Sequence, residues 1–83
     1  MKHIFHNIYS PYSGTIEKIL TKQTNHVYEW EKLFVINTME GKKEISVGIS
    51  GHIISLEVQE GETITPTTML GRIKDDLLIT GSD

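Results

Sequence analysis

The feature that most constrains the fold of this chain is an internal repeat. Shifting the sequence by 37 positions brings the segment that begins at Ser10 onto the segment that begins at Val47. The repeat predicts two structurally similar halves. The matching positions are apolar residues and glycines, which are the positions that define a fold: Ser13-Gly14 on Ser50-Gly51, Ile16 on Ile53, Ile19 on Leu56, Val27 on Ile64, Leu33 on Leu70 and Ile36 on Ile73.

Each half has the composition and the spacing of β-strands. Thr, Val and Ile dominate, and no helical stripe persists for three turns. The apolar residues are spaced by three and then by two in both halves, where strict alternation would give steps of two. We therefore expect a β-bulge at the same place in each half. The residues that show this spacing are Ile16, Ile19 and Thr21 in the first half and Ile53, Leu56 and Val58 in the second.

Two halves that each have one apolar face bury those faces by stacking as two small sheets. The predicted fold is all-β: a flattened β-barrel or sandwich of two antiparallel sheets with pseudo-twofold halves. With 83 residues there is room for one domain, divided into a first half (about 9–39), a hairpin tip (40–41), a second half (about 42–73) and a C-terminal extension (74–83). The expected core comprises Ile16, Ile19, Leu33, Val35, Ile53, Leu56, Val58, Ile64, Leu70 and Ile73.

The segment between the halves predicts an exposed hairpin. Apolar strand ends flank Glu40-Gly41, and a two-residue turn that contains glycine is a strong hairpin signal. Met39 and Lys42 are expected to close the turn. At the other end of the domain we expect the two chain ends to meet, with the Leu77–Ile79 run pairing with the Ile4–Ile8 segment within one chain or across a homodimer.

This arrangement resembles the biotinyl/lipoyl attachment (carrier) domain, a barrel-sandwich hybrid, over about residues 9–73. The family's opening Ser-Pro-x-x-Gly segment is present at residues 10–14, and its Glu-Gly-Asp-like turn is present as Glu-Gly-Glu at 60–62. In biotin carriers the hairpin reads Glu-Ala-Met-Lys-Met, with the lysine eleven residues before the glycine that opens the second half. Counting back eleven residues from Gly51 reaches Glu40, preceded by Met39. Thr38 matches the threonine of the Glu-Thr-Asp-Lys hairpin in lipoyl domains.

The chain departs from the family at the position that matters most. A carrier lysine accepts biotin or lipoate through its ε-amine, and Glu40 has no such nitrogen. The resemblance therefore implies no cofactor at Glu40. Lys42 and Lys43 lie nearby, and biotin or lipoate on either would require the hairpin to shift its register. Two further departures place Thr24 and Trp30 where the repeat or the family has glycine.

Other residues raise weaker hypotheses. Tyr28, Trp30 and Phe34 are close in sequence, and such aromatics either form an interface or fold back to plug the end of the barrel. Together with Met39 and Glu40, Tyr28 and Trp30 are the candidate interaction surface. The four histidines read as solvated surface residues, because their spacing does not suit a metal site and no carboxylate is paired with them in sequence; no metal is expected.

Composition excludes several classes of function. The net charge is −3 and the basic residues are scattered, so nucleic acid is not an expected partner. The chain has no cysteine and no long apolar stretch, so we expect a cytoplasmic protein with no membrane contact. No arrangement of catalytic residues predicts an enzyme.

Three functions fit these observations. The first is an unmodified carrier-like domain used for contact with a protein partner, associated with a biotin- or lipoyl-dependent enzyme system. The second is a working biotin or lipoyl carrier, a swinging arm for carboxyl or acyl transfer, modified on Lys42 or Lys43. The third is a structural module related to membrane-fusion adaptors, which share the hairpin fold.

Overall fold

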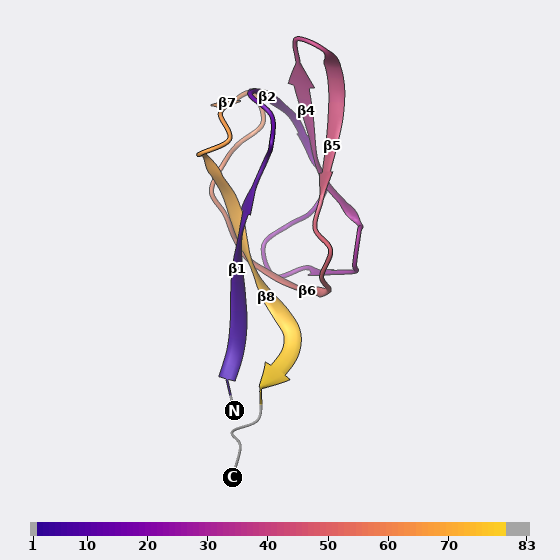
Figure 1. Ribbon diagram of the computed structural model, residues 1–83, viewed down its shortest axis with the longest axis vertical. Helices are drawn as coiled ribbons and strands as arrows, with labels where there is room; N and C mark the ends of the chain where they lie inside the picture. The colour runs from indigo at the N-terminus through magenta and orange to yellow at the C-terminus, as the bar shows by residue number, and fades with distance from the viewer. Residues whose placement is uncertain (1, 80–83) are drawn as a thin grey trace.

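The computed structural model describes residues 2–79 as two antiparallel β-sheets of four strands each (Figure 1). The strand order is β1-β8-β6-β3 in one sheet and β5-β4-β2-β7 in the other. No helix occurs among residues 2–79, as predicted, and so none that could span a membrane. The strands are β1 (Lys2–Tyr9), β2 (Gly14–Ile19), β3 (His26–Val27), β4 (Lys32–Thr38), β5 (Gly41–Ser46), β6 (Gly51–Leu56), β7 (Thr63–Ile64) and β8 (Met69–Ile79).

The hydrogen bonds of the two halves follow the 37-residue repeat. The amide of Thr24 donates to the carbonyl of Ile53 at 2.7 Å, and the amide of Gly61 donates to the carbonyl of Ile16 at the same distance. Thr24 and Gly61 are 37 positions apart in the sequence, and so are Ile16 and Ile53. The ladder β2–β4 is interrupted between Ile16 and Lys18, and the ladder β6–β8 between Ile53 and Ser55. The predicted pair of equivalent bulges is confirmed.

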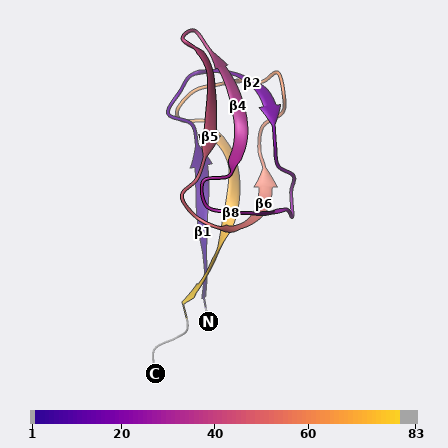
Figure 2. The same ribbon diagram turned by 90° about the vertical axis from the view of Figure 1, so that its right-hand side faces the viewer.

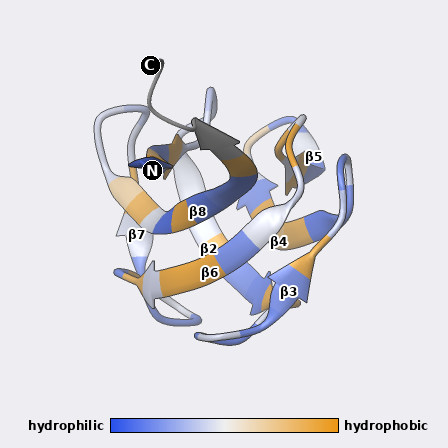
Figure 3. Ribbon diagram, turned by 90° about the horizontal axis from the view of Figure 1, so that it is seen from below, coloured by the Kyte–Doolittle hydropathy of each residue, from blue (hydrophilic) through white to orange (hydrophobic). Residues whose placement is uncertain are grey.

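The core lies between the two sheets, and apolar segments alternate with polar ones along the ribbons that surround it (Figure 3). Most of the predicted core is buried; Ile19, Val35 and Leu56 are half-buried instead. Phe34, which the sequence analysis grouped with Tyr28 and Trp30 but did not assign to the core, is completely buried. It follows Leu33, which is also buried, because the β4–β5 ladder is irregular between Lys32 and Phe34. Further core residues that the prediction lacked are Ile8, Val27, Ile36 and Ile45.

The two ends of the chain lie side by side, and the β4–β5 hairpin is at the opposite end of the long axis (Figures 1 and 2). β1 pairs with β8 over nearly its whole length, which confirms the predicted meeting of the termini within one chain. The predicted partners are wrong, however: Ile79 and Leu78 are opposite Lys2 and His3, and residues 5–8 are opposite residues 71–74. β8 therefore continues well beyond the part that pairs with β6.

Candidate functional site

The hairpin between β4 and β5 has a two-residue turn formed by Met39 and Glu40. Thr38 is opposite Gly41 in the ladder, so the predicted tip at Glu40-Gly41, closed by Met39 and Lys42, is one residue out of register. The hydroxyl of Thr38 stabilises the form of the turn: it accepts a hydrogen bond from the amide of Glu40 at 3.1 Å and donates one to the carbonyl of Gly41 at 2.8 Å. Gly41 supplies the positive φ of 111° with which the chain enters β5.

The turn presents two exposed side chains of different chemistry. Met39 is fully exposed, and Glu40 beside it is also exposed. A flexible thioether next to a carboxylate can make an apolar contact that is flanked by a negative charge. The hairpin apex can therefore bind a partner surface, but it offers no amine nucleophile.

Both lysines near the hairpin are on β5 and already have partners. Lys42 is opposite Asn37, and its ammonium nitrogen lies 3.0 Å from a carboxylate oxygen of Glu17 on β2. Lys43 is opposite Ile36, and its ammonium lies 5.7 Å from the centre of the Tyr12 ring. Both side chains thus contact other parts of the domain, below the turn.

The other two residues of the candidate interaction surface lie at the opposite end of β4. Tyr28 and Trp30 are both about two-thirds exposed, and the Trp30 ring lies against Gly48. The interpretation in which Trp30 plugs the end of the barrel is therefore wrong. β4 has seven residues, which at about 3.3 Å per residue separate the two pairs by about 23 Å. Tyr28 and Trp30 do not form one surface with Met39 and Glu40.

Two residues that replace glycines adopt a backbone conformation that glycine favours. Thr24 has φ 74° and Trp30 has φ 64°. Gly61, the repeat partner of Thr24, has φ 91°. Thr24 and Trp30 therefore adopt the backbone conformation of the glycines that they replace. This conformation costs each of them roughly 1–2 kcal/mol of folding free energy, because both have a side chain.

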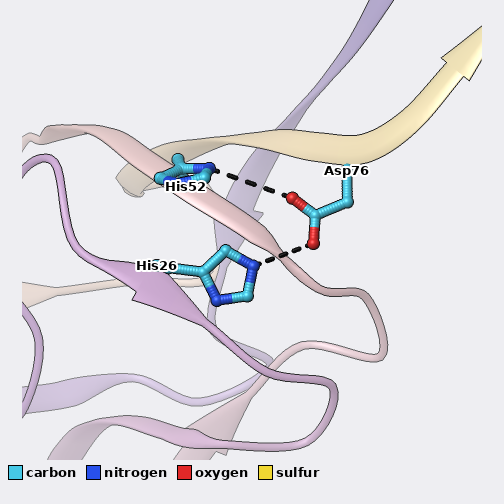
Figure 4. Close-up of side chains that lie close together, drawn as sticks. All are labelled: His26, His52 and Asp76. Atoms are coloured by element: carbon cyan, nitrogen blue, oxygen red, sulfur yellow. Dashed lines mark hydrogen bonds and ion pairs between the residues drawn. The ribbon is translucent and has the colours of Figure 1, made fainter.

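A second polar site, which the sequence did not predict, lies on the other sheet. His26 on β3 and His52 on β6 are opposite each other in the ladder, and Asp76 on β8 reaches both rings (Figure 4). The His26 Nε2 atom lies 2.8 Å from Asp76 Oδ2, and the His52 Nδ1 atom lies 3.8 Å from Asp76 Oδ1. The two imidazole rings meet edge to face with centroids 4.8 Å apart. The sequence pairs no carboxylate with these histidines, but the fold brings Asp76 to both of them.

A related pair lies near this cluster, on β1 and β8. His6 Nε2 is 3.1 Å from a carboxylate oxygen of Asp75. The Leu77 amide donates a hydrogen bond to Asp75, and together with His6 it lowers the pKa of that carboxyl from its ordinary value. Asp75 and Asp76 are consecutive on a strand, so they point to opposite faces and serve different histidines.

The repeat contained a signal for the histidine cluster. Thr15 is opposite Thr63 in the ladder between β2 and β7. In the repeat, Thr15 corresponds to His52 and Thr63 corresponds to His26. The pairing of the histidines could thus have been inferred from the repeat, whereas the position of Asp76 depends on the extension of β8 beyond it.

Comparison with known proteins identifies the family. The sequence profile of the family described as biotin-requiring enzyme matches residues 6–73. Because this range is most of the chain, the protein belongs to the biotin/lipoyl attachment domain family. A search among curated protein sequences finds no match.

Solved structures share the fold at low sequence identity. A single-chain, multi-domain long-chain acyl-CoA carboxylase matches with a TM-score of 0.80 and 11% identity over 86% of this chain. The urea carboxylase of Kluyveromyces lactis matches with a TM-score of 0.78 and 18% identity over 88% of this chain. The lipoyl domain of the 2-oxoglutarate dehydrogenase complex from Azotobacter vinelandii matches with a TM-score of 0.70 and 23% identity over 81% of this chain.

The matches differ in how much of the other protein they cover. The chain spans 7% of the acyl-CoA carboxylase and 6% of the urea carboxylase, but 92% of the lipoyl domain. It is thus similar to one small part of each large enzyme and to nearly the whole of the isolated lipoyl domain.

Proposed function

We propose that this domain is an unmodified member of the biotin/lipoyl family that acts through protein contacts, in association with a biotin- or lipoyl-dependent enzyme system. The observation that carries the proposal is Glu40 in the exposed turn, where counting eleven residues back from Gly51 leads us to expect the family's modified lysine. A lysine ε-amine forms an amide with the carboxyl group of biotin or lipoate. The carboxylate of Glu40 has no nitrogen with which to form that bond.

The geometry of the hairpin supports a contact role. The turn keeps a defined shape through the two hydrogen bonds of Thr38, and it projects from the end of the domain opposite the chain termini (Figure 1). Met39 gives this apex an apolar side chain that is fully exposed. An enzyme that receives the hairpin of a carrier domain can therefore receive this hairpin, but without a cofactor to act on. We propose that such an enzyme, or a subunit of its complex, is the partner.

The position of the lysines favours the unmodified state. A ligase that recognises the apex of the hairpin finds Met39 and Glu40 there, whereas Lys42 is directed toward Glu17 and Lys43 toward Tyr12. To carry biotin or lipoate, either lysine has to leave its partner and reach the apex from β5. This requirement distinguishes the proposed function from that of a working carrier.

The test is the intact mass of the protein after co-expression with a biotin ligase and, separately, with a lipoate ligase. The wild-type mass should not change. Glu40→Lys should gain the mass of one biotinyl or lipoyl group, because this variant restores an amine to the turn. A wild-type protein that is labelled, and that loses its label in Lys42→Ala or Lys43→Ala, would instead establish the working carrier. Near-native stability of Glu40→Lys, expected for an exposed turn, is the control for folding.

A further inference from the structure

Three neighbouring strands bring two imidazoles and one carboxylate together on the sheet that does not carry the hairpin. His26, His52 and Asp76 come from β3, β6 and β8, which are adjacent in the order β8-β6-β3. One potential ligand atom from each residue lies within 4.8 Å of the other two. Within the described part of the chain, this is the only group of three or more histidine, aspartate and glutamate side chains with such a separation.

We propose that His26, His52 and Asp76 bind a divalent transition-metal ion, with Zn²⁺ as the best match. Two imidazole nitrogens and a carboxylate oxygen are a donor set that suits Zn²⁺, and three protein ligands leave a fourth position for water. The carboxylate of Asp76 can only accept a hydrogen bond, so the Nε2–H of His26 is the donor of the 2.8 Å contact between them. A bound ion would replace that proton between the imidazole nitrogen and the carboxylate oxygen. The ligand atoms are His26 Nε2, His52 Nδ1 and one carboxylate oxygen of Asp76.

Binding requires the ligand atoms, which lie within 4.8 Å of one another, to move closer together. In a tetrahedral site with bonds of about 2.0–2.1 Å, ligand atoms are about 3.3 Å apart. The pair formed by His26 and Asp76 is already closer than this, at 2.8 Å, and the contact between His52 and Asp76 is 3.8 Å. The side chains of His52 and Asp76 are nearly half exposed, so both can rotate without disturbing the core. Figure 4 shows the three side chains converging from their strands.

The backbone beneath the cluster holds the three positions in place. His26 and His52 are direct partners in the β3–β6 ladder. The amide of Asp76 donates to the carbonyl of Ser50 at 2.9 Å, which fixes β8 beside the start of β6. A bound ion would therefore link β3, a strand of only two residues, to the long terminal strand β8. Because the ion binds the folded state, it should raise the melting temperature.

The pair formed by His6 and Asp75 supplies a matched control. It combines the same residue types at 3.1 Å and also uses β8, but it belongs to no group of three among the described residues. If any exposed pair of histidine and aspartate were enough for Zn²⁺, His6→Ala would weaken binding as much as His26→Ala. If the proposed site is correct, His6→Ala should bind Zn²⁺ like the wild type.

The experiment is a titration of the metal-free 83-residue protein with ZnCl₂, followed by calorimetry and by NMR of the imidazole nitrogens. One ion should bind per chain, with shifts at His26 Nε2 and His52 Nδ1 and a higher melting temperature. His26→Ala and Asp76→Asn should each weaken binding by at least about tenfold, the smallest loss usual even for groups that only support ligands. MgCl₂ at the same concentration should bind far more weakly, since Mg²⁺ prefers oxygen ligands.

Several results would overturn the proposal. The first is the absence of a saturable change at millimolar Zn²⁺, and the second is binding that persists in the double variant His26→Ala/His52→Ala. Equal binding of Mg²⁺, or a loss in His6→Ala as large as that in His26→Ala, would also overturn it. If a variant fails to fold, the ring-nitrogen shifts of the wild-type protein still decide, because they identify which nitrogens contact the ion. None of these outcomes depends on whether Glu40 is modified.

Discussion

The two ends of this domain are related by the 37-residue repeat, yet they carry different chemistry. The hairpin end carries Thr15, Thr63 and, just beyond the repeated segment, Met39. A shift of 37 positions takes these residues to His52, His26 and Asp76 at the terminal end. Thr15 and Thr63 are opposite each other in one sheet, just as His52 and His26 are in the other. One backbone arrangement thus supports hydroxyls and an exposed thioether at one end, and imidazoles and a carboxylate at the other.

The difference between the ends follows from what the chain does after the last shared strand. β4 turns back at Met39 and continues as β5, so that end of the domain is a free hairpin. β8 instead continues to Ile79 and pairs with β1 on both sides of Asp76, and the amide of Asp76 donates to the carbonyl of Ser50. The comparison shows that an exposed hairpin turn and a cluster of polar side chains within a sheet can arise from equivalent positions.

The largest expected effect concerns a core position at which the two halves differ. Phe34 is fully buried, and its repeat partner is Gly71. At this position the first half therefore contributes a large side chain to the core, and the second half contributes none. Phe34→Ala should lower the free energy of unfolding by about 3–5 kcal/mol, measured by urea denaturation. Phe34→Leu should lose less, and a loss below about 1 kcal/mol for Phe34→Ala would contradict this account of the core.

Two glycines should behave alike, because the repeat places them in equivalent surroundings. A methyl group on Gly14 would overlap the carbonyl oxygen of Asn37, and one on Gly51 would overlap the carbonyl oxygen of Lys74. Gly14→Ala and Gly51→Ala should each lower the free energy of unfolding by about 1–3 kcal/mol, as overpacking usually does. Gly41→Ala meets no neighbour within 4 Å, but Gly41 has φ 111°, so this variant reports the cost of a left-handed backbone without steric overlap. Unequal losses at Gly14 and Gly51 would show that the halves relax differently.

The repeat explains which parts of this structure could be predicted from sequence. The bulges, most of the core and the meeting of the termini follow from periodic apolar residues, which report burial directly. The burial of Phe34 was missed because the irregular β4–β5 ladder breaks the alternation next to Leu33. The turn was placed one residue too late because the burial of Ile36 and Ile45 sets the register of the hairpin, and the predicted core contained neither residue. The cluster was missed because Asp76 lies beyond the repeated segments.

A smaller effect is expected at Thr24, because this threonine adopts a backbone conformation that glycine favours. Thr24 and Gly61 donate equivalent hydrogen bonds and both have positive φ, but only Gly61 adopts that conformation without a steric penalty. Thr24→Gly should therefore raise the free energy of unfolding by up to about 1 kcal/mol, since the relief of strain exceeds the entropy that glycine adds to the unfolded chain. Gly61→Ala should lower it by a similar amount. Thermal melts of both variants give the comparison, and destabilisation by Thr24→Gly would mean that the threonine side chain makes a compensating contact.

The smallest expected effect tests what fixes the register of the hairpin. Lys42→Ala removes an exposed ion pair and should change the free energy of unfolding by less than about 0.5 kcal/mol. Thr38→Val removes two hydrogen bonds of the turn and should lower it by about 1 kcal/mol. Both values come from urea denaturation.

Thr38→Val should nevertheless remain unlabelled by biotin ligase. A slip of one residue would turn Ile36 and Ile45 out of the core, where both are buried now, and that penalty exceeds the loss of two exposed hydrogen bonds. The core thus determines the register of the strands, and Thr38 determines only the form of the turn. If Thr38→Val gains the mass of a biotinyl group and Lys42→Ala in that background removes it, the hydroxyl of Thr38 is what keeps Lys42 from the apex.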